Sequence, residues 1–178
     1  MKRLNLGCGA DYKPGWINID CVPGAHADRL MDLEKTPWAF QDGSIDEIFA
    51  SHVIEHLRNP LSVFKEIHRI LKPNGKLTMR VPHFSRGWVH PLHKCSFSYN
   101  FPEILDHECV GIGLRVVTKK FKWNHPDLKF NHFAAFMAVC DKVFSFFANL
   151  YPIACERIWC YWVGGFDEIE FVFVKGGD

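Results

Sequence analysis

Two glycines and an aspartate near the N-terminus have the types and spacing of a ligand-binding turn. The run Leu4-Asn5-Leu6-Gly7-Cys8-Gly9 indicates a short strand that ends at a Gly-Cys-Gly turn, and Asp20 ends the next β-prone run. Glycines after a strand let a ligand approach the backbone, whose N–H groups can bind it. A carboxylate at the end of the neighbouring parallel strand commonly holds a ribose diol. The pattern therefore predicts a seat for a nucleoside-bearing cofactor.

The same spacing argues against a dinucleotide. A dinucleotide turn has the form G-x-G-x-x-G, with an acidic residue about 20 positions further on. Tyr12 stands where the third glycine is needed, and Asp20 comes early. A cofactor with a nucleoside end, a compact amino-acid end and no phosphate fits better. A nucleotide-sugar or dinucleotide enzyme is accordingly the weaker interpretation.

The turn opens an ordered series of motifs that resembles the class I S-adenosylmethionine-dependent methyltransferases, in particular short members similar to methyltransferase type 11. The similar segments cover residues 3–81 and are Leu4-Asn5-Leu6-Gly7-Cys8-Gly9, Gly15-Trp16-Ile17-Asn18-Ile19-Asp20, Asp32-Leu33-Glu34, Asp42-Gly43-Ser44-Ile45-Asp46-Glu47-Ile48, Ser51-His52-Val53-Ile54-Glu55-His56-Leu57 and Ile70-Leu71-Lys72-Pro73-Asn74-Gly75-Lys76-Leu77. The resemblance implies S-adenosyl-L-methionine as the cofactor, methyl transfer as the activity, and a reduced first crossover helix. The acceptor is not implied; we expect a small molecule.

The resemblance also implies a set of cofactor-binding residues. These are Asn5, Gly7, Cys8, Gly9, Asp20, Asp32, Leu33, Ser51 and His52. Gly7 and Gly9 would let the methionine moiety lie against the backbone, Cys8 would serve as a small packing residue, and Asp20 would accept hydrogen bonds from both ribose hydroxyls.

The other positions in this set would divide between the two ends of the cofactor. Asp32 and Leu33 would border the adenine, whereas Ser51 and His52 would line the methionine end near the transferable methyl group. The partner of the methionine carboxylate stays open, with the Tyr12-Lys13 pair as a candidate. We therefore expect the secure part of the site to be its nucleoside end.

Histidines and cysteines are dense after the fifth predicted strand. They are His83, His90, His93, Cys95, His107 and Cys109. A loop at this edge of a parallel sheet would face the acceptor, and histidine suits a base near neutral pH. We take His83 and His93 as candidate catalytic bases, with ordinary hydrogen-bonded histidines as the plain alternative. His52 and His56 are four positions apart, as in two-His metal sites, but the order H-E-x-x-H is absent, and His90-x-x-His93-x-Cys95 offers ligand types without an established spacing, so we predict no metal.

Strands and connections alternate through the first eighty residues, which is typical of an α/β fold. The expected strands span residues 2–6, 16–20, 28–33, 46–51, 76–81, 114–123 and 168–174. Asn59-Pro60 predicts the start of a helix, and apolar residues in the segment that follows form one face of that helix. Together with the resemblance, this predicts a Rossmann-like class I methyltransferase sheet that is mostly parallel and carries an antiparallel C-terminal strand.

We expect one domain over residues 1–178, with a cofactor-binding half, 1–81, and an acceptor-side half, 82–178. The second half contains a short helix near 101–107 and an apolar helix over 131–150 with a narrow polar stripe. Such a helix is usually buried or covered by a partner. Region 131–162 is thus expected to pack on the sheet, shape an acceptor pocket or join a homo-oligomer.

Composition limits the partners and the compartment. The formal net charge is +1, which gives no overall attraction to nucleic acid, although Arg115, Lys119, Lys120 and Lys122 could form a basic stripe. Charged residues inside the apolar helix argue against a membrane span. Seven cysteines without a C-x-x-C indicate reduced thiols and a cytoplasmic location. The competing functional class is a non-catalytic S-adenosylmethionine-binding module or an inactive partner subunit.

Overall fold

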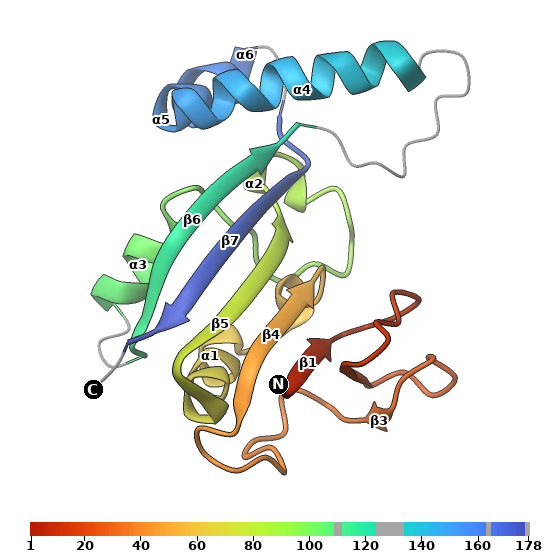
Figure 1. Cartoon of the computed structure of the whole chain (residues 1–178). Helices are drawn as coiled ribbons and strands as arrows, with labels where there is room; N and C mark the ends of the chain where they lie inside the picture. Colours follow the sequence, from red (N-terminus) through yellow and green to blue (C-terminus); the bar gives the residue numbers. More distant parts are fainter. Residues whose placement is uncertain (109–111, 124–133, 163–164, 177–178) are drawn as a thin grey trace.

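A seven-stranded sheet forms the framework of the computed structural model, which describes residues 1–108, 112–123, 134–162 and 165–176 (Figure 1). Its strands are β1 (Arg3–Leu6), β2 (Ile17–Asp20), β3 (Arg29–Leu30), β4 (Ile45–Ser51), β5 (Leu71–Pro82), β6 (Leu114–Lys122) and β7 (Glu168–Lys175). The order is β3-β2-β1-β4-β5-β7-β6, in which β7 pairs antiparallel with both neighbours and the other pairs are parallel. The predicted fold class is therefore confirmed.

The helices and short turns of helix fill the connections. They are η1 (Ile54–His56), α1 (Pro60–Ile70), α2 (Phe84–Gly87), α3 (Phe101–Glu108), α4 (Ala134–Leu150), α5 (Pro152–Ala154), η2 (Cys155–Trp159) and α6 (Cys160–Trp162). Residues 7–16, all of them described, contain no helix, so the reduced first crossover is confirmed. Some details differ from expectation: β3 has only two residues, β5 begins at Leu71 rather than at position 76, and α2 was not predicted.

Helix α1 begins where the sequence predicts. The Asn59 side chain accepts a hydrogen bond from the Ser62 N–H at 3.2 Å, and Pro60 occupies the first turn, where its missing N–H is not needed. The apolar face of α1 is buried in the core through Val63, Phe64 and Ile67. Burying each such side chain contributes about 1.5–3 kcal/mol, so packing rather than helix propensity holds α1 in place.

Side chains alternate along the central strands between a buried and a more open face. In β5, Leu77, Met79 and Val81 are buried, whereas their neighbours Lys76, Thr78 and Arg80 are partly exposed or exposed. Figure 1 shows α1 and α3 behind the sheet, with no helix drawn across the front of β4, β5 and β7. The open face instead carries cross-strand ion pairs, including Arg80 with Glu170 at 2.7 Å. One face thus makes the core and the other stays polar.

Helix α4 lies across the ends of β6 and β7 rather than on a face of the sheet (Figure 1). Two residues of its polar stripe bond the end of β6 and the residue after it: the Ser145 hydroxyl accepts the Trp123 N–H at 3.0 Å, and Asn149 bonds both backbone groups of Phe121 at 2.8 and 3.0 Å. Its other side chains are largely exposed, such as Phe136 at 63% and Phe146 at 64%. The prediction of core packing for this helix is therefore wrong on its apolar side, because its polar side is used to cap β6.

The apolar helix was expected over positions 131–150; α4 is described over Ala134–Leu150, and positions 131–133 fall outside the described residues. Among the helices that are described, none has the length and apolarity needed to cross a membrane. Six cysteines within the described ranges are free thiols.

Candidate active site

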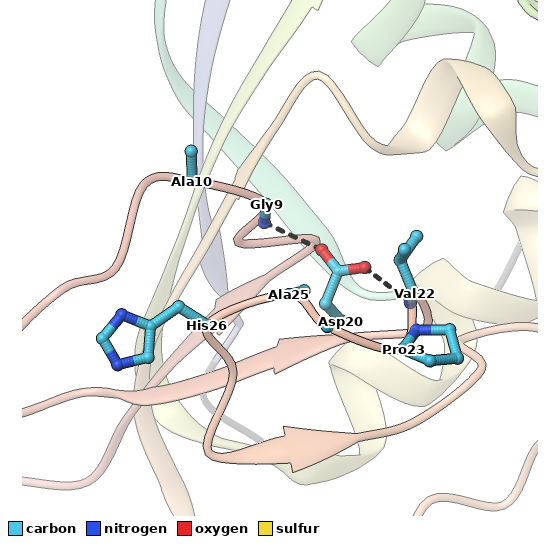
Figure 2. A pocket seen from close by; sticks show the side chains of 8 residues that line it. Gly9, Ala10, Asp20, Val22, Pro23, Ala25 and His26 are labelled. Atoms are coloured by element: carbon cyan, nitrogen blue, oxygen red, sulfur yellow. Dashed lines mark hydrogen bonds between the residues drawn. The ribbon is translucent and has the colours of Figure 1, made fainter.

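Asp20, the last residue of β2, connects the turn after β1 to the turn after β2. One carboxylate oxygen accepts the Gly9 N–H at 2.8 Å and the other accepts the Val22 N–H at 2.9 Å, as Figure 2 shows. The residue is 8% exposed. Each carboxylate oxygen can accept a second hydrogen bond, so Asp20 keeps capacity for a diol while its backbone partners fix its orientation.

The two glycines of the turn have different physical reasons to be glycine. Both have positive φ, +61° at Gly7 and +48° at Gly9. A Cβ on Gly7 would lie 2.5 Å from Val53 Cγ2, whereas a Cβ on Gly9 would meet nothing within 4 Å. Gly7 is therefore required by packing against Val53. Gly9 is open on the side from which a ligand can approach the backbone.

Two cavities, each about 450 Å³, meet at Gly7, Gly9 and His52. The first also contains Asp20, Met31, Asp32 and Leu33, which are the residues expected around ribose and adenine. The second also contains Asn5, Cys8, Ser51 and Arg80. The structure thus brings all of the sequence-predicted cofactor residues to the walls of two adjoining cavities at the C-terminal edge of the sheet.

Asn5 and Cys8 contribute mainly by holding the turn. The Asn5 amide donates to the Asp11 carbonyl at 2.7 Å and to Asn18 Oδ1 at 2.9 Å, and Asn5 is 2% exposed. The Cys8 N–H donates to the Ile19 carbonyl at 3.0 Å, and burial raises the pKa of its thiol. A neutral buried thiol is a packing group rather than a nucleophile, as expected.

Asp32 and Leu33 differ in exposure in the way an adenine site needs. Leu33 is buried in the core, while the Asp32 side chain is 44% exposed. One Asp32 oxygen accepts the Glu34 N–H at 3.0 Å, which holds the loop after β3. The pair offers an apolar edge beside an anchored carboxylate.

His52 sits where the two cavities join, and it is held in a cationic form. Its Nε2 lies 2.9 Å from Glu168 Oε2, and its Nδ1 lies 3.3 Å from Glu55 Oε1. The hydrogen bond to Glu168 and the interaction with Glu55 outweigh burial and raise the pKa of His52 to about 9. At neutral pH this imidazolium can donate hydrogen bonds but cannot act as a base. Its φ of +52° is unusual for a side-chain-bearing residue, and such backbone strain clusters at functional sites.

The cavity walls also contain residues that were not among the predicted site residues, including Arg80, Lys122 and Glu168. Lys122 Nζ lies 2.6 Å from Glu168 Oε1. Burial alone would raise the pKa of Glu168, but the bonds from His52 and Lys122 outweigh it and hold the pKa well below its usual range. The feature of the sequence that could have identified these residues as site residues is their position at strand ends. That position predicts a place in the cavity only once the pairing of β5, β6 and β7 is known.

His83 does not have the surroundings of a catalytic base. It is 0% exposed, its Nδ1 lies 2.6 Å from the Ser85 hydroxyl, and its Nε2 lies 3.2 Å from Glu156 Oε1. Phe121 and Phe166 pack against its ring. No acceptor can reach it, so His83 is corrected to a buried hydrogen-bonded residue of the core.

His93 is placed closer to the cavities. Its side chain is 11% exposed, with Nε2 4.0 Å from the buried Glu55 carboxylate. Its ring centroid is 4.8 Å from that of His56, which lines the cavity that contains Asp20. His93 therefore lies one residue away from the cavity wall, and its role as a base stays a prediction.

Tyr12 and Lys13 are not among the residues that line the two cavities. The Tyr12 hydroxyl donates to Asp28 at 3.1 Å, and Lys13 pairs with Asp11 at 2.8 Å. Arg80 and Lys122 are instead the cationic Arg and Lys residues in the cavity wall beside Gly9. Arg80 and Lys122, rather than Lys13, are thus the positive charges placed to meet the methionine carboxylate.

The predicted basic stripe and the predicted histidine–cysteine group are both reduced by the structure. Lys119 pairs with Glu103 and Lys122 with Glu168, so part of the stripe is already neutralised. Burial raises the pKa of Cys95 to about 11, which leaves a neutral thiol that is a poor metal ligand. The side chains of His107 and Cys109 lie outside the described part of the chain.

Comparison with known proteins agrees with the geometry. Residues 7–79 match a family described as a methyltransferase domain. The chain is 40% identical over 79 residues to a highly reducing polyketide synthase of Aspergillus sclerotiorum, and 35% identical over 63 residues to a malonyl-[acyl-carrier protein] O-methyltransferase of a Marinomonas species. These matches cover 43% and 32% of this chain but only 3% and 23% of those proteins.

The fold has relatives among solved structures. A crystal structure of an S-adenosylmethionine-dependent methyltransferase from Archaeoglobus fulgidus aligns with a TM-score of 0.62 at 16% identity, covering 98% of this chain and 86% of that chain. At this identity the likeness concerns the fold. It extends the match from the first 79 residues to the whole sheet, including β6 and β7.

Proposed function

We propose that this chain is a class I methyltransferase that uses S-adenosylmethionine and transfers its methyl group to a small-molecule acceptor. The observation that carries the proposal is the junction of two cavities at Gly9 and His52, with the Asp20 carboxylate anchored beside it. The enclosed space and its lining fit a nucleoside at one end and an amino-acid group at the other. Asp20 and Leu33 would hold the nucleoside, and Gly9 would lie against the methionine part.

The second cavity supports a way to hold the methionine carboxylate. Arg80 and Lys122 line it together with the glycine turn. Arg80 gives one guanidinium donor to Glu170 at 2.7 Å, and a guanidinium carries further donors. We assign the carboxylate to Arg80, with Lys122 as the second positive charge. Charge-assisted hydrogen bonds of this kind are stronger than neutral ones.

The chemistry asks mostly for positioning. When bound, the cofactor supplies an electrophilic methyl group, which a lone pair of the acceptor displaces. His52 and Glu168 keep each other charged and so offer a fixed dipole rather than a base. An acceptor hydroxyl or amine that must lose a proton would need another group, and His93 is our candidate for it. In-line placement of the acceptor would provide most of the rate.

An apolar cavity supports an acceptor with an apolar part. This cavity, about 280 Å³, lies between α4 and η2 and is lined by Phe144, Phe147, Trp159 and Phe166. Phe166 precedes Glu168 by two positions, so the cavity and the cofactor site share one end of β7. A small molecule could place its apolar body here and its reactive atom toward His52.

Partners and location are part of the same proposal. The exposed apolar side of α4 supports self-association, and the free thiols support a cytoplasmic location. The paired lysines of β6 do not favour nucleic acid. A non-catalytic cofactor-binding module or an inactive partner subunit is not favoured by the matches to methyltransferases.

Calorimetry and a turnover assay test the proposal. S-adenosylmethionine is expected to bind at one site per chain, and NAD is expected not to compete; NAD preference would contradict the cofactor assignment. Release of S-adenosylhomocysteine is then measured over a panel of small amines, hydroxy acids, phenols and thiols with and without apolar chains. A compound-dependent release establishes the enzyme. Tight cofactor binding without release for any class of acceptor would contradict the enzymatic assignment and favour the binding module.

A further inference from the structure

Three histidines from two separate segments converge beside the cofactor cavity. His56 lies in η1, whereas His90 and His93 lie in the loop after α2. Each offers a ring nitrogen, and the three atoms lie within 4.8 Å of one another. His90 and His93 stack with their ring centroids 4.7 Å apart, and His56 is edge-on to both. We propose that His56, His90 and His93 form a binding site for a divalent cation of the zinc class.

The backbone prepares two of these rings as ligands. His56 Nδ1 lies 3.3 Å from the Leu92 carbonyl, and His93 Nδ1 lies 2.5 Å from the Gly87 carbonyl. A carbonyl can only accept, so each Nδ1 carries the proton and each Nε2 keeps its lone pair. Metal-binding histidines are characteristically fixed in this way, by a hydrogen bond from the second ring nitrogen. This pattern gives a direct reason for the Nε2 atoms to face a cation.

A buried carboxylate provides an independent observation. Glu55 is 0% exposed, and within the described residues neither of its oxygens has a partner in hydrogen-bond geometry. One oxygen lies 4.0 Å from His93 Nε2 and 3.3 Å from His52 Nδ1. A buried acceptor without a full set of partners is costly, and a nearby cation would lower that cost. Glu55 therefore fits as the anion behind the ligands.

Binding of a zinc ion would require the three ligand nitrogens to move only a short distance toward one another. Tetrahedral zinc with Zn–N bonds of about 2.0–2.1 Å places ligand nitrogens roughly 3.3 Å apart. The ligand nitrogens start within 4.8 Å of one another, and His90 is exposed, so its side chain can turn without disturbing the core. The loop itself is anchored, because the Lys94 N–H donates to the Glu55 carbonyl at 2.8 Å. Three imidazoles leave a fourth position for water or a ligand atom, which is the arrangement of an open rather than a structural site.

The proposal revises the expectation of no metal and uses a different residue set from His90-x-x-His93-x-Cys95. Sequence spacing missed it because His56 is 34 positions from His90. His93 would then be a ligand and not a base. The site stands on its own geometry and does not depend on methyl transfer.

Metal binding to the full chain tests the inference directly. Protein freed of its affinity tag and dialysed against a chelator is titrated with Zn²⁺ by calorimetry, and with Co²⁺ by visible absorption, which reports tetrahedral imidazole ligation. One ion per chain is expected. His90→Ala and His93→Ala should each weaken Zn²⁺ binding by at least on the order of tenfold, since even loss of an outer partner costs about 10–100-fold.

The matched control is His26→Ala, which removes an exposed histidine stacked on Tyr12 in a different part of the molecule. It should leave the Zn²⁺ affinity unchanged. Because His90 is exposed, His90→Ala should retain the far-UV circular dichroism of the parent, and its result decides the matter even if His93→Ala does not fold. Failure of the parent to bind, or equal affinities for parent and His90→Ala, would overturn the proposal.

Discussion

His52 and Glu168 form an ion pair, with Nε2 and Oε2 2.9 Å apart, across 116 positions of sequence. The pair joins the end of the parallel strand β4 to the start of the antiparallel strand β7. It therefore connects the cofactor half of the sheet to the half that carries α4 and the apolar cavity. This ion pair joins the two halves of the sheet at the place where the methyl group of the cofactor and the acceptor would meet.

The protonation of His52 can be measured. Histidine ring resonances followed by NMR should show one imidazole with a pKa near 9, and Glu168→Gln should lower it toward the ordinary value of about 6.5. The folded pKa is the higher one, so the stabilisation is complete below about pH 6.5 and is lost as the pH rises through about 9. The side chain is 35% exposed, so after solvent screening we expect on the order of 1 kcal/mol. A His52 pKa unchanged in Glu168→Gln would contradict the pairing.

The features of the fold that were predicted correctly depend on local sequence patterns. The Gly-Cys-Gly turn, the short link to Asp20 and the Asn59 cap each act within a few residues, and the structure has them as expected. Helix α4 shows where local reasoning stops. Its amphipathic pattern correctly predicts a helix, but the pattern cannot tell that Ser145 and Asn149 are needed to cap β6.

The site residues divide in the same way, into those that chain order brings together and those that long-range strand pairing brings to the cavity. Gly9 follows β1 and Asp20 ends the next strand, β2, which pairs with β1 in parallel, so their proximity follows from chain order. Glu168 and Lys122 reach the cavity through antiparallel pairing of β7 with β5 and β6, which is a long-range choice. His83 illustrates the opposite error, because a histidine near a catalytic edge was assumed to face it, whereas Glu156 from η2 holds it inside the core.

Removal of the Asp20 carboxylate should weaken S-adenosylmethionine binding. Asp20→Ala is expected to raise the dissociation constant at least tenfold, about 1.4 kcal/mol, because the ribose hydroxyls lose a charged acceptor. Asp20→Asn retains the shape and an oxygen for the Gly9 N–H, but its NH2 group cannot accept the Val22 N–H, so its stability is measured beside its affinity to separate lost charge from lost turn geometry. Asp42→Ala removes an exposed carboxylate that pairs with Arg69 and serves as the calorimetric control. Unchanged affinity in Asp20→Ala would refute the ribose role.

Alanine at the two glycines should have different consequences, mainly for stability at Gly7 and mainly for cofactor affinity at Gly9. In Gly7→Ala the new Cβ meets Val53 at 2.5 Å, so urea denaturation should show a clear loss of stability, on the order of 2 kcal/mol or more. Gly9→Ala adds only the cost of a left-handed backbone, about 1–2 kcal/mol, into open space. Its cofactor affinity should nevertheless fall more than its stability explains. Equal affinities for Gly9→Ala and the parent would show that no ligand lies against this backbone.

The exposed side of α4 is expected to mediate self-association. Phe136, Phe146 and Phe147 are each more than half exposed. Light scattering coupled to gel filtration should give a dimer or larger species, and Phe146→Asp should shift it toward the monomer because a buried charge at an apolar contact is costly. Leu30→Asp, at an exposed apolar residue of β3, is the matched control. A monomeric parent at all concentrations would contradict the expectation.

Arg80 provides the sharpest separation of the two ends of the cofactor. If it faces the methionine carboxylate, Arg80→Met should weaken S-adenosylhomocysteine about tenfold, consistent with a charge-assisted bond of roughly 1.5–3 kcal/mol. Methylthioadenosine lacks that carboxylate, so its affinity for the variant should stay close to that for the parent. Lys76→Met, on the same strand and likewise paired with a glutamate, is the control for lost surface charge. If both ligands weaken equally in Arg80→Met, the residue supports the fold of the cavity and does not bind the carboxylate.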